Sequence, residues 1–161
     1  EARLPFDQAA AKKLLADAGY RYSSSIYPVK HDLYGMPDAS RTPFRPNGGA
    51  VWELPMTTLR VANRNLPCSG GGFFRLLPYP IFRLGLARVN THERRSGIFY
   101  FHPWEIDPGQ PRIVGASLRS RLRHYINLDK TEKRLDRLLR DFAWNRMDHV
   151  FAEILHPAPV Q

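Results

Sequence analysis

One stretch of the sequence, residues 97–108, combines strand-forming residues with side chains that can transfer protons. It reads GIFYFHPWEIDP, so His102 directly follows an apolar run. Pro103 then ends any strand pairing, because proline has no backbone N–H to donate. An apolar strand at residues 97–101 that ends in a histidine is typical of an α/β barrel, where active-site side chains sit at the carboxyl ends of the strands. A buried histidine bonded to a backbone carbonyl is the alternative, and the stretch alone does not separate the two.

His102 is followed by three side chains that could act together with it. Glu105 and Asp107 are candidate partners that would keep the imidazole protonated, and Trp104 could form either a wall for a sugar ring or part of the core. Both roles of the indole are kept open, since carbohydrate sites and protein cores both use tryptophan.

Two further stretches carry candidate binding groups. Ser24 and Ser25 belong to a run of serines near the end of an expected strand, where their hydroxyls could contact a ligand or satisfy turn N–H groups. Arg75 follows three glycines in CSGGGFFRLLP and could hold a carboxylate or phosphate with its planar fork. The glycines lack the spacing of a P-loop or a dinucleotide site, so they predict a sharp turn or a close backbone approach.

The periodicity of apolar residues predicts a mixed α/β chain. We expect helices at residues 8–18, after the three glycines around Phe82 to Val89, and from Asp129 to about Phe142, where Leu138 and Leu139 would be buried. We expect a strand and its exit within residues 20–29, and strands at residues 51–59 and 97–101, the former interrupted by Pro55. This alternation favours a mostly parallel α/β architecture.

The composition limits the class of protein. The chain has 161 residues with 43% hydrophobic residues, which is enough for a globular domain. Its formal net charge of +9 favours anionic partners, although dispersed structural arginines are the simpler explanation. Residues 117–126 contain Arg119, Arg121 and Arg123, which form either an anion-binding stripe or a solvated helix face. One cysteine is compatible with a reducing compartment, so we expect a cytoplasmic protein, and no apolar run is long enough to predict a transmembrane segment.

Four stretches, taken in order, resemble a known family. They are RYSSSIYPVKHDLYGMPDA, WELPMTTLR, GGGFFRLLPY and FYFHPWEIDPGQPR. The chain resembles the C-terminal portion of NodB-like polysaccharide deacetylases of the exosortase- and exopolysaccharide-associated type, which carry a C-terminal extension of unknown function. The resemblance implies the C-terminal half of a distorted (β/α) barrel of the glycoside hydrolase/deacetylase type at residues 1–108. It also implies an α-rich extension at residues 109–161 that packs on the barrel.

The resemblance also implies roles for individual residues. Arg3 would orient the catalytic aspartate, and His102 would be the general acid in the hydrolysis of N-acetyl groups on an exopolysaccharide. Together with Ser24 and Ser25 of the serine run, Arg75 and Trp104 are expected from their own chemistry to contact the substrate, a polysaccharide or another N-acetylated glycan. Residues 22–25 match the YDSS motif of the family, except that Ser23 stands where the family usually has aspartate.

The metal-binding motifs of the family are not found in this sequence. A complete member would use a divalent, zinc-like metal, yet no two of the six histidines are three or four residues apart. We therefore expect no metal site from this chain alone, and no activity until a missing N-terminal half or another chain completes a barrel, which usually needs about 200 residues or more. The alternative function is a non-catalytic module that binds anionic glycans through Arg75 and the three arginines of residues 117–126. A nucleic-acid partner is not expected, because no nucleic-acid-binding motif is present.

Overall fold

The structure is a computed structural model that describes residues 8–31 and 34–156. The predicted site residue Arg3 lies outside the described residues. The chain divides into two compact units, one made of Glu1–Met56 and Phe151–Gln161 and the other of Thr57–Val150. The predicted domain boundary between residues 108 and 109 thus falls inside the second unit.

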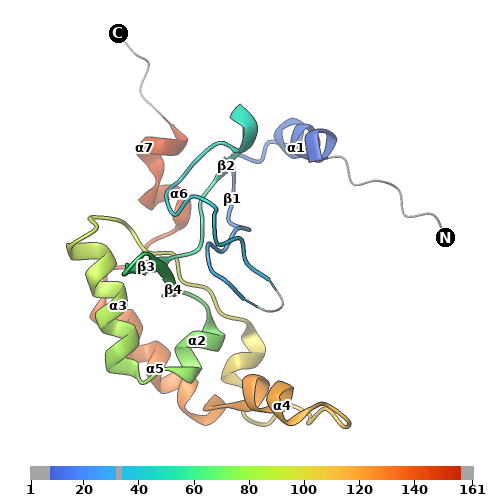
Figure 1. The fold of residues 1–161 in the computed structure, drawn as a ribbon, viewed down its shortest axis with the longest axis vertical. Helices are drawn as coiled ribbons and strands as arrows, with labels where there is room; N and C mark the ends of the chain where they lie inside the picture. The colour runs from blue at the N-terminus through green and yellow to red at the C-terminus, as the bar shows by residue number, and fades with distance from the viewer. Residues whose placement is uncertain (1–7, 32–33, 157–161) are drawn as a thin grey trace, which may run out of the picture. The chain divides into compact units, whose positions relative to one another are not determined.

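The described residues of the first unit form one helix of more than two turns and one short parallel strand pair. Its elements are α1 (Gln8–Asp17), β1 (Tyr22–Ser23), the 3₁₀ helix η1 (Pro46–Gly48), β2 (Trp52–Glu53) and α7 (Ala152–Leu155), as Figure 1 shows. Helix α1 confirms the predicted helix, and Gly19 follows it with a positive φ of 83° that suits a helix C-terminus. Strands β1 and β2 pair in parallel, with Tyr22 opposite Trp52.

The strand predicted within residues 20–29 is confirmed as the short β1, and it ends at the first serine of the run, Ser23, for a clear reason. The backbone N–H groups of Ser25 and Ile26 donate to the Glu53 carboxylate instead of to a neighbouring strand, each at 2.8 Å. A carboxylate that accepts two N–H groups replaces the strand pairing at that point. The break expected near Pro55 is confirmed, because β2 ends at Glu53 and the next strand begins at Thr58.

The second unit begins with a hairpin and continues with helices. Its elements are β3 (Thr58–Val61), β4 (Arg64–Pro67), α2 (Gly71–Leu76), α3 (Tyr79–Thr91), the 3₁₀ helix η2 (Pro103–Ile106), α4 (Leu118–Tyr125), α5 (Leu128–Asp141) and α6 (Met147–Val150). Strands β3 and β4 are antiparallel and are joined by Ala62 and Asn63, which have φ values of 43° and 62°. Two left-handed residues are what a tight two-residue hairpin turn requires.

The core of the second unit is aromatic and forms between α2, α3 and α5. The rings of Phe74 and Phe82 meet edge to face, and Leu86 and Leu138 are buried beside them. The predicted helices over these residues are confirmed, but Leu139 is 54% exposed and its predicted burial is wrong. One residue along a helix is a rotation of about 100°, so Leu139 points away when Leu138 faces the core.

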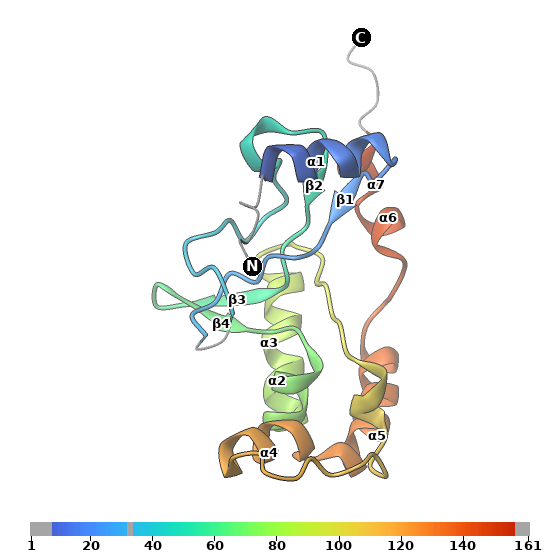
Figure 2. The same cartoon turned by 90° about the vertical axis from the view of Figure 1, so that its right-hand side faces the viewer.

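The segment that was predicted as the fourth strand, residues 97–101, is not a strand. It runs back beside α3 as irregular backbone, as Figure 2 shows, and among the described residues it has no strand partner. Side-chain contacts hold it there. The ring of Phe99 packs against Phe74 and Phe82, and the Ile98 N–H donates to the Thr57 hydroxyl at 2.5 Å.

The fold is therefore a mixture of helices and short strands, as predicted at the level of class. The sheets of the described residues have two strands each, one pair parallel and one antiparallel, so the half barrel stays a prediction. No helix within residues 8–31 and 34–156 has the length and apolar character that crossing a membrane requires.

Candidate functional site

The backbone of His102 is fixed by the short helix that follows it. His102 is the N-cap of η2, and its own N–H donates to Oε2 of Glu105 at 2.8 Å. The Glu105 N–H donates in return to the His102 carbonyl at 2.9 Å. These reciprocal bonds, together with the fixed φ of Pro103 at the first helical position, set the direction in which the His102 side chain leaves the backbone.

A buried ion pair holds Glu105 in turn. Oε1 of Glu105 lies 3.0 Å from both Nε and Nη2 of Arg75, and each side chain is only 2% exposed. The remaining Arg75 N–H groups donate to the carbonyls of Arg123, His124 and Ile126. Arg75 therefore closes the C-terminal end of α4, where helix carbonyls lack partners within the helix.

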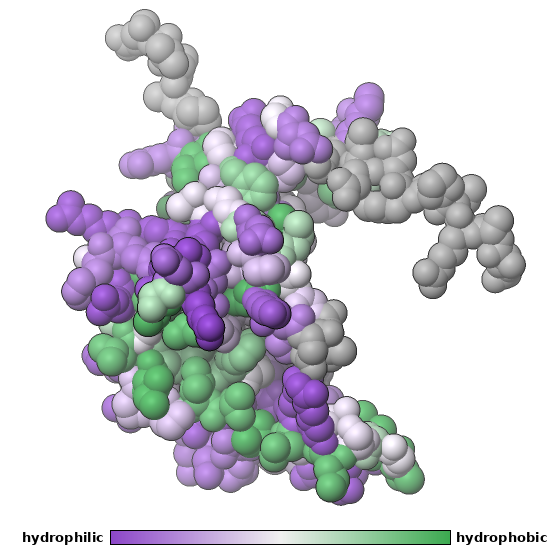
Figure 3. Space-filling model, in the orientation of Figure 1, coloured by the Kyte–Doolittle hydropathy of each residue, from purple (hydrophilic) through white to green (hydrophobic). Residues whose placement is uncertain are grey.

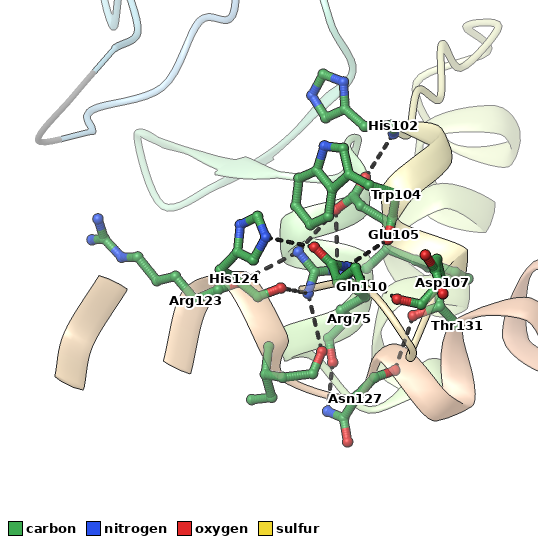
Figure 4. Close-up of polar contacts among 12 residues, drawn as sticks. Arg75, His102, Trp104, Glu105, Asp107, Gln110, Arg123, His124, Asn127 and Thr131 are labelled. Carbon is green, nitrogen blue, oxygen red and sulfur yellow. Dashed lines mark hydrogen bonds and ion pairs between the residues drawn. The ribbon is translucent and has the colours of Figure 1, made fainter. Parts of the chain in front are cut away.

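Arg75 binds a carboxylate of its own chain. The planar fork does hold a carboxylate, as its chemistry predicted, but that carboxylate belongs to Glu105 of the same chain. The guanidinium makes four hydrogen bonds within the protein in addition to the ion pair, and Figure 4 shows Arg75 among these partners. A contact of Arg75 with substrate stays a prediction, and it would need a different arrangement of these groups.

Two of the three glycines, Gly70 and Gly71, pack closely against the 97–108 stretch. A Cβ added at Gly71 would overlap with the Glu105 carboxylate, and one added at Gly70 would come within 2.9 Å of the Tyr100 ring. Gly70 also has a positive φ of 84°. The sharp turn predicted before a helix is confirmed, because Gly70 precedes α2 with its positive φ. The close approach at Gly70 and Gly71 is to the 97–108 stretch of the same chain, so the approach to a ligand stays a prediction.

Two histidines and one tryptophan form an aromatic stack above the ion pair. The half-buried Trp104 ring is nearly parallel to the rings of His102 and His124, with centroid distances of 5.8 and 4.3 Å. The Arg75 guanidinium carbon lies 5.2 Å from the Trp104 ring centre, and Gln110 links His124 to the Trp104 carbonyl through its amide. We call His102, Trp104 and His124 the aromatic stack; Figure 4 shows it against the ion pair.

Within the aromatic stack, His102 is the exposed member. The alternative of a buried histidine bonded to a carbonyl is therefore wrong. The two acids expected to pair with the His102 imidazole make other contacts. The Glu105 carboxylate accepts the backbone N–H of His102, and Oδ1 of Asp107 accepts the N–H of Gly109. The sequence analysis did not predict that His124 and Gln110 belong to this cluster. The one signal that could have indicated it is that Gln110 lies only two residues after the 97–108 stretch.

Ser24 and Ser25 lie in the first unit and have protein partners. The Ser24 hydroxyl donates to the Leu54 carbonyl at 2.7 Å, while the Ser25 hydroxyl donates to Glu53 at 3.1 Å. Glu53 is 3% exposed, and the sequence analysis did not single it out. These contacts organise a turn, so the contact of the two serines with substrate remains a prediction.

The described residues provide no evident metal centre. Residues 8–31 and 34–156 contain no group of three or more His, Cys, Asp and Glu side chains placed to hold a metal ion. The single cysteine, Cys68, is buried, and burial raises its thiol pKa to about 12, with a smaller contribution from Glu93. A thiol that stays protonated at neutral pH is neither a good ligand nor a nucleophile.

Comparison with known proteins identifies the family. A family described as a domain of unknown function, DUF3473, matches residues 24–152, and the chain belongs to it. The match includes Ser24, Ser25, the Arg75–Glu105 pair and the aromatic stack. No curated protein and no solved structure matches the chain.

Proposed function

We propose that this chain is the C-terminal portion of a polysaccharide de-N-acetylase and carries the general acid of the site. The observation that supports this function best is the exposed His102 imidazole on a backbone fixed by Glu105. A general acid has to reach substrate from a defined direction, and the buried pair beneath η2 provides that rigidity. The half barrel implied by the resemblance is part of the same proposal.

The chemistry that His102 would perform is the protonation of the departing amine. Hydrolysis of an N-acetyl group breaks the bond between the acetyl carbon and the sugar nitrogen, and an amine leaves readily only when it takes up a proton. In the proposal the protonated imidazole donates that proton from its exposed ring. Trp104 stacks between His102 and His124, and this contact limits the orientations of the His102 ring.

The divalent metal that a complete polysaccharide deacetylase would use is a separate part of the proposal. The described residues do not fit such an ion, so the proposal assigns its ligands to residues outside this part of the chain. The proposed contribution of this chain is restricted to the acid and its support.

The test uses the protein that contains this chain, with an N-acetylglucosamine oligomer as substrate. Replacing His102 by alanine is expected to lower kcat by about 100-fold or more, the usual contribution of a positioned general acid. His149→Ala is the matched control, because His149 is an exposed histidine on α6 with no proposed role. Equal activity of the His102 variant and the control would refute the proposed role.

A further inference from the structure

The segment from Gly109 to Leu128 has an unusual charge pattern. It contains four arginines, Arg112, Arg119, Arg121 and Arg123, and no aspartate or glutamate. All four arginines are exposed, and three of them lie on α4. A basic segment without acids attracts anionic partners, because no internal carboxylate offsets its field.

The same segment exposes aliphatic side chains next to these arginines. Val114 is 97% exposed, Leu118 82%, Leu122 61% and Ile113 56%. We call these four residues and the four arginines the basic–aliphatic surface. Figure 3 shows apolar and strongly polar groups side by side over α4 and the loop that precedes it. Aliphatic residues clustered at such exposure are typical of a surface that another phase or molecule covers.

Specific hydrogen bonds hold this segment in place. The Tyr125 hydroxyl donates to the Pro111 carbonyl and accepts the Ile113 N–H at 2.7 Å, which fixes the base of the loop. The Ser117 side chain caps the start of α4 by accepting the Ser120 N–H. Arg75 holds the carbonyls at the other end of the helix. The aliphatic side chains are therefore presented by an anchored structure.

We propose that the basic–aliphatic surface docks the protein on an anionic lipid bilayer. Arginines would lie among the lipid phosphates while Val114 and Leu118 enter the boundary between headgroups and acyl chains. Charge complementarity requires an anionic partner, and the protruding aliphatic residues distinguish a bilayer from a soluble polyanion, which offers no apolar phase. This surface is independent of the proposed function, since none of its arginines takes part in the acid's chemistry.

The electrostatic part is tested by sedimentation of the chain with phosphatidylcholine vesicles that contain or lack phosphatidylglycerol. We expect binding to the anionic vesicles that weakens as salt is added. Changing Arg119, Arg121 and Arg123 together to glutamine should lower the partition coefficient about 100-fold, because each basic residue near the membrane contributes about 1 kcal/mol. The control variant changes exposed Arg64, Lys130 and Lys133 to glutamine; it has the same net charge and should retain most of the binding.

The apolar part separates a bilayer from other anionic partners. The pair Val114→Ser and Leu118→Ser keeps the charge and should lower vesicle binding about tenfold or more, since two side chains no longer leave water. Circular dichroism checks that each variant keeps its helices. Unchanged binding of this pair would mean that only charge is recognised, as with an acidic glycan, and would overturn the proposal. Equal binding to neutral vesicles, or equal losses in both charge variants, would also overturn it.

Discussion

The contact between Gly71 and Glu105 gives a sharp test of how the site is held together. Gly71 is the first residue of α2, and a Cβ added there would overlap with a carboxylate that is already bonded to Arg75 and to the His102 N–H. In the Gly71→Ala variant the carboxylate has to move, which separates the buried pair. The substitution adds a single methyl group, yet it should also weaken the hydrogen bond between the Glu105 carboxylate and the His102 N–H.

The expected magnitude follows from two opposed contributions. Breaking a buried ion pair costs about 3–5 kcal/mol, because one charge is left without its partner. Alanine is favoured over glycine in a helix by about 1 kcal/mol. The net loss in the free energy of unfolding is therefore expected to be about 2–4 kcal/mol, measured by urea denaturation monitored with circular dichroism.

The neighbouring glycine supplies the matched control. A Cβ at Gly72 would have no heavy atom within 4 Å among the described residues, and Gly72 lies in the same helix. Gly72→Ala should leave stability unchanged or raise it by up to about 1 kcal/mol through helix propensity alone. If Gly71→Ala were as stable as Gly72→Ala, the close packing of the glycine motif on Glu105 would be refuted.

Three further predictions concern stability. The variants Arg75→Met and Glu105→Leu should each lose about 3–5 kcal/mol, but the double variant should lose less than the sum, because no charge remains buried alone; additive losses in a double-mutant cycle would contradict this. Ala62→Gly should raise the free energy of unfolding by about 1 kcal/mol, since Ala62 has a φ of 43° in the hairpin turn, and an unchanged denaturation midpoint would count against the turn. Burial and the hydrogen bond to Asp141 raise the pKa of Tyr79 from 10.0 to about 12. Its contribution is complete below pH 10 and is lost as the pH rises towards 12, so alkaline titration should destabilise the protein by about 3 kcal/mol more than it destabilises Tyr79→Phe.

The helices were predictable because their patterns depend on local residues. Apolar spacing located α1, α3 and α5. Helix α4 was only one of two interpretations of the basic residues at 117–126. The strands were predicted less well, because pairing depends on distant residues. At residues 97–101 the composition favours a strand, but there Phe99 packs its ring against Phe74 and Phe82 in the aromatic core.

The candidate site was predictable as a motif and not as an arrangement. The sequence pointed to His102, Trp104, Glu105 and Arg75, and the structure brings these four together. Their pairing was not readable from the sequence, because Arg75 and Glu105 are 30 residues apart. The hairpin at Ala62 and Asn63 was missed for a related reason, since neither residue is the glycine that usually marks such a turn.

The proton-donor role of His102 is the central claim, and the dependence of activity on the leaving group tests it most directly. The measurement compares wild type and His102→Ala, in the protein that contains this chain, on an N-acetylated amino sugar and on an acetanilide with an electron-poor ring. Such an aniline leaves without full protonation, so the claim predicts a large loss of kcat on the sugar and a much smaller loss on the acetanilide. Equal losses on both substrates would contradict it and would assign His102 a structural role.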